Sequence, residues 1–346
     1  MTGSSSALSA VDARERSPAE HGRIYRGLRG LLVKNPQASP VDLAGKRILV
    51  TGASPGSLGF ETAHALAAWG ASVVVTARKR PEACVAALRQ RLCDEAVGRR
   101  VDGYALDLSV AESVEAFARG YAEHYGEHLD VLINNAGAHL DLLSRWRKPR
   151  QSADGFELHW RTNYLGTAHL THALLPVLKA RARAKGEARI VNVASRLHTR
   201  GTNAELFEQT RRYNSWNAYG QSKLALVHMT SELERRFGEE LGLHAYCLHP
   251  GSVFTNLADR GLAGTGPFQT VRGWLSYLEA FILKTAEEGA QTQIYCATQP
   301  GLRGGQYYAQ CGAAAPSPEA RAPAVAARLW DETRAWVHAR SRPSEA

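Results

Sequence analysis

The chain has 346 residues, of which 44% are hydrophobic and 22% are charged, a composition that indicates a globular protein with a sizeable core and excludes a fibrous or wholly disordered chain. The formal net charge of +9 would suit nucleic-acid binding, but the basic residues are scattered and no aromatic-basic motif occurs, so no nucleic-acid partner is expected. Nowhere do about 18 apolar residues run together, so the sequence predicts no membrane span.

The N-terminal part differs in composition from the rest. Residues 1–42 are predicted to be an extension, and residues 43–340 a single folded domain. The extension begins with a Ser-, Ala- and charge-rich stretch that is expected to be disordered. Residues 22–34 form a basic amphipathic segment, for which packing on the domain is favoured over docking on a membrane surface. The Pro-containing residues 35–43 are interpreted as a linker.

Beyond the extension, short apolar runs alternate with longer helical patterns. Strands are expected at 47–51, 72–76, 104–106, 129–133, 189–194 and 243–248, and helices at 59–69, 81–97, 110–125, 154–184 and 218–240. This alternation indicates βαβ units and hence an α/β fold with a doubly wound parallel sheet of the Rossmann type. Such sheets bind ligands beyond the carboxyl ends of their strands, so the functional residues are expected there.

A glycine-rich segment, TGASPGSLG, joins the first expected strand to the first helix and contains Gly52, Gly56 and Gly59. Glycines let the turn tighten and let the backbone approach a pyrophosphate, which then sits at the helix N-terminus. Gly also marks ordinary turns, but its position between strand and helix favours a dinucleotide site.

Three consecutive cations, Arg78, Lys79 and Arg80, follow the second expected strand. An NAD-binding unit carries an acidic residue about 20 positions after the glycine loop, where it holds the ribose hydroxyls. Arg78 stands there instead, and a guanidinium fits a 2′-phosphate, so the pattern favours NADP(H). Asp107, after the third strand, could bond the adenine, although Asp at a strand end is also ordinary turn chemistry.

A Tyr and a Lys four residues apart, Tyr219 and Lys223 in YGQSK, open the last long helix and share one of its faces. A phenol has a pKa of about 10 in water, and a neighbouring ammonium favours the phenolate, so Tyr219 is a candidate proton donor and acceptor. Ser195, after the fifth strand, would hydrogen-bond the substrate oxygen and stabilise charge that develops there. A Tyr-x-x-x-Lys pair alone occurs by chance, so its weight comes from the motifs before it.

Together these motifs resemble the short-chain dehydrogenase/reductase family. TG…G…G, NNAG, Ser195, YGQSK and HPGSVFT stand in the family's order over most of the chain. The resemblance implies a catalytic tetrad of Asn163, Ser195, Tyr219 and Lys223, in which Asn163 holds a water of a proton relay and Lys223 also binds the nicotinamide ribose. It also implies cofactor contacts from Gly52, Ser54, Gly56, Leu58, Gly59, Arg78, Asp107, Leu108, Asn135, Lys223, Pro250, Gly251, Val253 and Thr255.

A narrower resemblance is to the retinol dehydrogenase and WW-domain oxidoreductase branch, and to related bacterial ketoreductases. It rests on GFETA, DGFELHWRTNYLGTAHLT, VNVASRLH and GGQYYAQCGAAAPSPEA. It implies an NADP(H)-dependent ketoreductase, or the reverse alcohol dehydrogenase, for a lipophilic small molecule. Residues 253–284, rich in aromatic and aliphatic side chains, resemble the substrate lid of this fold, although such a stripe also suits a core face or a subunit interface.

The sequence departs from the family pattern in two places. One extra residue separates Gly56 from Gly59, and Pro55 lacks an N–H, so the grip on the phosphates is expected to differ in detail. The 16 residues 138–153 form a long basic loop, which is either a solvated surface or a contact for an acidic substrate or carrier protein.

Two other functions stay open at this point. One is reduction of a carbon–carbon double bond, as in the related protochlorophyllide reductases. The other is a non-catalytic dinucleotide-binding scaffold, in which the tetrad would tend to be broken, whereas all four residue types are present here. Family members commonly pair their two long helices, here 154–184 and 218–240, so a homodimer or homotetramer is expected.

The five Cys residues include no CxxC pair, which favours reduced thiols and a cytoplasmic location. Cys247 and His249 share one face of an expected strand, but no further ligand stands at a suitable spacing, so no metal site is expected.

Overall fold

The computed structural model describes residues 35–92, 100–139, 148–208, 211–251 and 284–340. Most of the N-terminal extension, residues 140–147 of the basic loop and all but the last residue of the expected lid lie outside these ranges. Within the described ranges no helix combines the length and the apolar character that a membrane span requires.

An eight-stranded sheet forms the centre, with the strand order β3-β2-β1-β4-β5-β6-β7-β8. Its strands are β1 (Arg47–Thr51), β2 (Ser72–Ala77), β3 (Val101–Ala105), β4 (Val131–Asn134), β5 (Ala188–Val193), β6 (Leu243–Leu248), β7 (Tyr307–Ala309) and β8 (Gly312–Ala314). Strands β1 to β7 are parallel and β8 is antiparallel to β7. The order reverses between β1 and β4, which is the switch point where such sheets bind ligands. The predicted fold class is therefore confirmed, with one antiparallel strand added at the edge.

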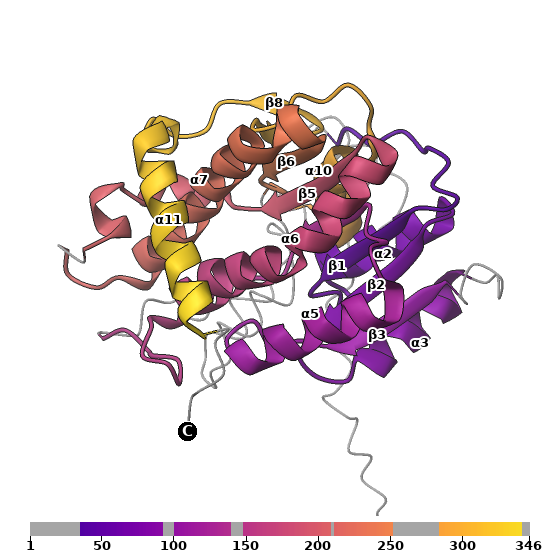
Figure 1. Ribbon diagram of the computed structural model, residues 1–346, viewed down its shortest axis with the longest axis horizontal. Helices are drawn as coiled ribbons and strands as arrows, with labels where there is room; N and C mark the ends of the chain where they lie inside the picture. The colour runs from indigo at the N-terminus through magenta and orange to yellow at the C-terminus, as the bar shows by residue number, and fades with distance from the viewer. Residues whose placement is uncertain (1–34, 93–99, 140–147, 209–210, 252–283, 341–346) are drawn as a thin grey trace, which may run out of the picture.

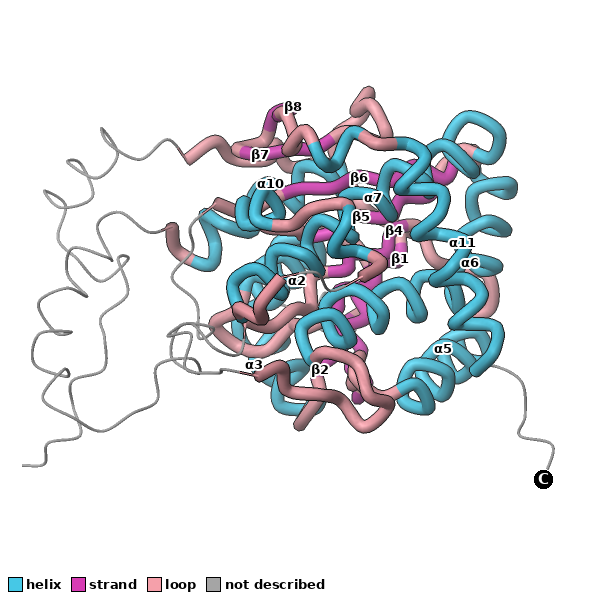
Figure 2. The backbone as a smooth tube through the Cα atoms, turned by 90° about the vertical axis from the view of Figure 1, so that its left-hand side faces the viewer, coloured by secondary structure: helices cyan, strands magenta, loops and turns pink. Residues whose placement is uncertain are grey.

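Helices cover both faces of this sheet (Figures 1 and 2). They are α2 (Leu58–Ala68), α3 (Pro81–Leu92), α5 (Ala111–Tyr125), the π-helix η2 (Trp160–Leu165), α6 (Gly166–Lys185), α7 (Ser215–Leu241), α10 (Ala286–Thr298), α11 (Pro323–Arg340) and the short 3₁₀ turns η3 (Arg196–Arg200), η4 (Ala204–Leu206) and η5 (Glu319–Arg321). One core cluster joins α5, α6 and α7 to the sheet, and another joins α2, α3 and α10 to its opposite face.

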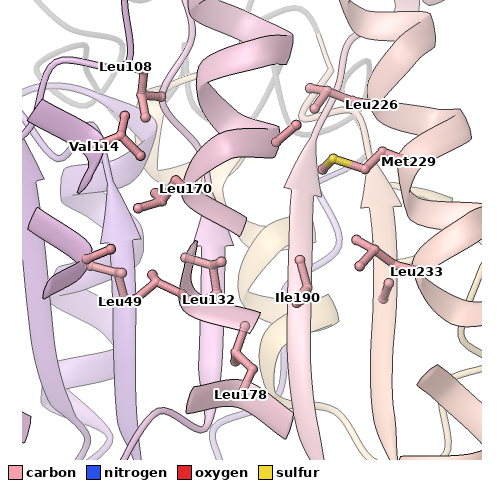
Figure 3. Close-up of a cluster of buried hydrophobic side chains, with 14 of the residues drawn as sticks. Leu49, Leu108, Val114, Leu132, Leu170, Leu178, Ile190, Leu226, Met229 and Leu233 are labelled. Atoms are coloured by element: carbon pink, nitrogen blue, oxygen red, sulfur yellow. The ribbon is translucent and has the colours of Figure 1, made fainter. Parts of the chain in front are cut away.

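Strand alternation explains these two clusters. On β1, Ile48 and Val50 belong to the cluster with α2, whereas Leu49 belongs to the cluster with α6. Figure 3 shows the cluster that joins α5, α6 and α7 to the sheet, with Leu132 and Ile190 of the sheet near side chains of α6 and α7. Each fully buried Leu or Ile contributes roughly 1.5–3 kcal/mol, so the sheet is a rigid base for the residues at its carboxyl edge.

Several expected boundaries differ from the structure. Strand β3 covers Val101–Ala105 instead of 104–106, because its pairing with β2 begins at Val101. The helix expected from residue 154 begins later, since Asp154 accepts hydrogen bonds from Ser152 and Arg161 in an irregular turn, and Gln151 bridges Glu157. Strands β7 and β8 and helices α10 and α11 were not predicted.

The segment expected to be a linker is packed against α10. The side chain of Asn35 donates to Glu288 at 2.8 Å, and the backbone N–H of Ala38 donates to Gln291 at 3.1 Å. Ala38 and Leu43 are buried in the core cluster under α2 and α10. Packing therefore extends N-terminal of the predicted domain start at residue 43.

Helix α11 packs across α7 and α6 (Figure 1). These are the two long helices that were expected to form the interface between subunits. The ring of Trp330 on α11 lies 4.4 Å from His172 on α6 and 6.0 Å from Phe237 on α7. The hydroxyls of Thr333 and Tyr164 are 2.8 Å apart. A dimer built on α6 and α7 would have to use the surface that α11 leaves uncovered, and the oligomeric state stays a prediction.

Candidate active site

The residues singled out in the sequence meet at the carboxyl edge of the sheet. Gly52 and Ala53, which follow β1, both donate their backbone N–H to the carbonyl of Thr76 near the end of β2, at 2.9 and 3.0 Å. The glycine loop therefore lies beside the segment that carries Arg78. Asn135 and Ser195 follow β4 and β5 at the same edge, because parallel strands end on the same side.

The glycine loop is held tightly against the start of α2. Gly52 and Gly56 have positive φ values of 72° and 76°, a region that L side chains rarely adopt. The side-chain amide of Asn135 donates to the carbonyls of Thr51 and Gly52, at 2.7 and 3.2 Å. The Ser57 hydroxyl accepts the N–H of Phe60 as the N-cap of α2. This arrangement presents a helix N-terminus beside a close backbone turn, which suits a pyrophosphate.

Gly59→Ala is expected to weaken dinucleotide binding and lower thermal stability. A methyl group there would meet the carbonyl oxygen of Gly52 at 2.6 Å and would also meet the amide of Asn135. Overpacking of this kind costs about 1–3 kcal/mol, so a roughly tenfold rise in the Kd for a reduced nicotinamide dinucleotide is expected in a fluorescence titration.

Gly120→Ala in α5 is the matched control, because a methyl group there has no neighbouring heavy atom within 4 Å. Ala is the better helix former by up to about 1 kcal/mol, so this variant is expected to be more stable with unchanged affinity. Unchanged dinucleotide affinity in Gly59→Ala would contradict the assignment of this loop to a dinucleotide.

The end of β2 carries the cationic residues of the site. Arg78, Lys79 and Arg80 are exposed, and Arg80 has a positive φ of 53°. Asp107, after β3, uses one carboxylate oxygen for the N–H and the hydroxyl of Ser109, at 2.9 and 2.6 Å, which is turn chemistry. The Leu108 side chain packs in the core beside Val114 (Figure 3), so only its backbone remains for a cofactor contact.

Tyr219 lies in the first turns of α7 with 9% of its surface exposed. Burial raises the pKa of its phenol, and a hydrogen bond with the Ser195 side chain partly opposes this rise. The His139 ring stacks on the Tyr219 ring, with centroids 4.6 Å apart and an interplanar angle of 22°. A buried phenol with a raised pKa stays protonated near neutral pH and can donate a proton.

Lys223 is buried one helical turn further along α7. Its ammonium donates to the carbonyl of Val193 at 2.8 Å and lies 5.7 Å from the centroid of the Tyr219 ring. Burial lowers the pKa of Lys223 to about 8. The sequence predicted that this ammonium lowers the pKa of Tyr219, whereas burial dominates the pKa of both groups here.

Asn163 lies in the π-helix η2 and is fully buried. Its side chain accepts the N–H of Ala138 at 2.8 Å and donates to the carbonyl of Ala138 at 2.9 Å and to the Ser222 hydroxyl at 3.2 Å. It therefore clamps the segment after NNAG onto α7. A π-turn inside a longer helix is common at functional sites, and here it points this amide at the chain beside Lys223.

Arg161 was missed at the sequence level, although it stands inside a motif that carries the resemblance. Its side chain is buried, donates to the Leu108 carbonyl at 2.6 Å and to Asp154 at 2.8 Å, and lies over the Trp336 ring. It thus ties the segment after β3 to the π-helix that carries Asn163. The available signal was Asp154 in the DG motif, seven residues before Arg161, since a buried Arg needs a carboxylate partner.

The remaining predicted residues are placed in part. Ser54 lies in the glycine loop, Leu58 begins α2, and Pro250 follows β6 at the same edge. Val253 and Thr255 lie outside the described residues. Cys247 is buried, and no cluster of metal-ligating side chains occurs among the residues that the structure describes.

Comparison with known proteins agrees with this geometry. Residues 46–263 match the family described as short chain dehydrogenase. Retinol dehydrogenase 11 from Homo sapiens is 36% identical over 312 residues, which cover 88% of this chain and 89% of the relative. Retinol dehydrogenase 14 from Mus musculus is 38% identical over 302 residues, which cover 83% and 84%. The crystal structure of an uncharacterized protein from Mycobacterium paratuberculosis has 30% identity and a TM-score of 0.63, with 86% of this chain and 95% of that chain covered.

The family match covers more than half of the chain, and the similarity to the retinol dehydrogenases covers most of it. The chain therefore belongs to the short-chain dehydrogenase/reductase family, resembles the retinol dehydrogenases within it, and is an oxidoreductase that acts on alcohol or carbonyl groups.

Proposed function

We propose that this protein is an NADPH-dependent ketoreductase for a lipophilic small molecule. The observation that carries the choice of NADP(H) is the exposed cation group that begins at Arg78, beside the glycine loop. The position where an NAD site would hold a carboxylate is Arg78, and a guanidinium pairs well with a 2′-phosphate. The residues present therefore fit this cofactor.

In the proposed mechanism Tyr219 donates a proton to the substrate oxygen. The bound reduced nicotinamide supplies the hydride. Ser195 holds the substrate oxygen and stabilises the negative charge that develops on it, as preorganised donors do. Lys223 holds the ribose, and its positive charge favours the phenolate that Tyr219 leaves behind. Asn163 fixes the chain beside Lys223 and is proposed to serve the proton relay.

A lipophilic substrate is supported by the names of the relatives, which are retinol dehydrogenases. The apolar composition of residues 253–284 also supports it, and these residues lie outside the described ranges except for Lys284. A cytoplasmic location is supported by the free thiols of Cys84, Cys247, Cys296 and Cys311, since thiols stay reduced in that compartment.

The test is NADPH oxidation, followed at the nicotinamide absorbance, with a panel of lipophilic ketones, aldehydes and enones, and with NADH in parallel. Alcohol products from ketones with NADPH would support the proposal. An enone that gains hydrogen but keeps its carbonyl would indicate a carbon–carbon double-bond reductase instead. NADPH binding without turnover on the whole panel would favour the non-catalytic scaffold.

Arg78→Asp is expected to weaken NADPH binding selectively, because it replaces a charge-assisted contact to the 2′-phosphate with a repelling carboxylate. Hydrogen bonds to charged groups contribute about 1.5–3 kcal/mol, so the ratio of NADPH to NADH affinity should fall roughly 10- to 100-fold. Arg334→Asp, an equal change of charge on the exposed side of α11, is the control. Equal losses for both cofactors would show that Arg78 is not the discriminating residue.

A further inference from the structure

The backbone carbonyl of Ser195 belongs to a buried hydrogen-bond network that includes His198 and Tyr307. The Nδ1 atom of His198 lies 2.8 Å from the carbonyl oxygen of Ser195. The Nε2 atom of the same ring lies 2.9 Å from the backbone nitrogen of Ser317. The hydroxyl of Tyr307, on β7, lies 3.3 Å from the Ser195 carbonyl. His198 and Tyr307 are each 3% exposed.

The partners of His198 fix its tautomer. A backbone N–H can only donate, so Ser317 makes Nε2 an acceptor. The proton of the neutral ring is then on Nδ1, which donates to the Ser195 carbonyl. Burial lowers the pKa of His198, which keeps the ring in this neutral form near neutral pH.

The backbone and hydroxyl of Ser195 are thus held from two directions. Its carbonyl accepts from His198 and Tyr307, while its hydroxyl oxygen accepts the N–H of Leu197 at 3.2 Å and hydrogen-bonds Tyr219. The N–H of Leu197 already occupies one lone pair of the Ser195 hydroxyl oxygen. The hydroxyl proton is therefore directed elsewhere, toward the phenolic oxygen of Tyr219 or a substrate oxygen.

We infer that His198 is a positioning residue, which acts through the Ser195 carbonyl to hold the Ser195 hydroxyl against Tyr219, with Tyr307 and Ser317 as its anchor. A packing role alone would not need an imidazole, since an apolar side chain of similar shape avoids the cost of burying polar atoms. This inference rests on the proposed function of Ser195 in carbonyl reduction.

The test compares His198→Leu with His198→Asn, two side chains of nearly the same shape. The amide nitrogen of Asn can take the place of Nδ1 and donate to the Ser195 carbonyl, whereas Leu cannot donate. His198→Leu should lower kcat roughly 10- to 100-fold, because small displacements of a reacting group cost about 10²-fold. His198→Asn should recover most of this loss, and NADPH affinity should be unchanged in both.

A double-mutant cycle with Ser195→Ala separates positioning from general damage. In the Ser195→Ala background, His198→Leu should change kcat by less than about threefold, because the group that it positions is gone. An equal loss in both backgrounds, or Asn no better than Leu, would overturn the inference. Thermal unfolding of each variant identifies loss of kcat that comes from misfolding.

A second readout needs no substrate, so it stays informative if the proposed reaction is wrong. The readout is the NMR signal of Tyr219 in protein isotopically labelled at the hydroxyl-bearing ring carbon of tyrosine. This signal is identified by its loss in Tyr219→Phe. His198→Leu should move this signal and raise the pKa of Tyr219 as Ser195→Ala does, while His198→Asn should resemble the unsubstituted protein. A Tyr219 signal unmoved by His198→Leu would overturn the inference even if carbonyl reduction is established.

Discussion

Tyr219→Phe is expected to lower turnover by about 10²–10⁴-fold, the usual contribution of a positioned general acid. The phenol is buried, hydrogen-bonded to Ser195 and kept protonated by its surroundings, so its removal takes the proton donor away without opening the site. Phe keeps the ring that stacks on His139 at 4.6 Å, so the local packing should survive. The measurement is kcat for NADPH oxidation on the best substrate of the panel, with the Kd for NADPH measured separately.

The affinity for NADPH should stay within about twofold of the unsubstituted protein, because the dinucleotide is proposed to be held mainly by the glycine loop, Arg78 and Lys223. Tyr213→Phe is a matched control, since Tyr213 lies just before α7 and its hydroxyl bonds Glu157 at 3.1 Å. It should keep most of the activity. A Tyr219→Phe enzyme that still turns over at a normal rate would refute the proposed mechanism.

The parts of the fold that the sequence predicted are those with strong local patterns. The apolar runs of β1, β2 and β6 lie at the expected positions, and parallel strands end at one edge, so Ser195 and Asn135 were expected at that edge. The Tyr219 and Lys223 pair lies on one helix, where a spacing of four fixes their relation.

The parts that were missed depend on contacts between distant segments. Strands β7 and β8 have three residues each, and the turn between them places Gln310 and Cys311 at positive φ values of 49° and 52°. Such hairpin turns normally carry Asn-Gly or a Gly at the two central positions, and Gln310 and Cys311 occupy those positions here. His198 meets Ser317 across 119 positions of sequence, which no local pattern can indicate.

Burial of the tetrad was also not predictable from spacing. The sequence places an ammonium near a phenol, and the ammonium was expected to lower the pKa of Tyr219. The structure adds desolvation, which acts against the charged form of each group and dominates at Tyr219 and Lys223. The site is therefore built at a cost in stability, which is common where a charge is needed for chemistry.

Lys223→Met should therefore lose activity and gain stability. The pKa of Lys223 falls from 10.5 to about 8 on folding, so burial of its ammonium destabilises the folded protein by roughly 3 kcal/mol. The substitution removes this cost but also removes the hydrogen bond to the Val193 carbonyl, which contributes about 1 kcal/mol. The cofactor-free variant should melt a few degrees higher at pH 7. Turnover should fall below detection, and NADPH affinity should drop about tenfold or more with the loss of the proposed ribose contact.

The stability that Lys223→Met gains over the unsubstituted protein should decrease as the pH rises. Below about pH 8 Lys223 is protonated in both folded and unfolded protein, so the whole penalty is present. Between about pH 8 and 10.5 the folded protein releases the proton while the unfolded chain keeps it, so the unsubstituted protein gains stability relative to Lys223→Met. The difference in Tm should shrink across this window, whereas Lys185→Met, at an exposed position, should differ little from the unsubstituted protein throughout. A lower Tm for Lys223→Met at pH 7 would mean that the buried ammonium stabilises the fold, contrary to the desolvation argument.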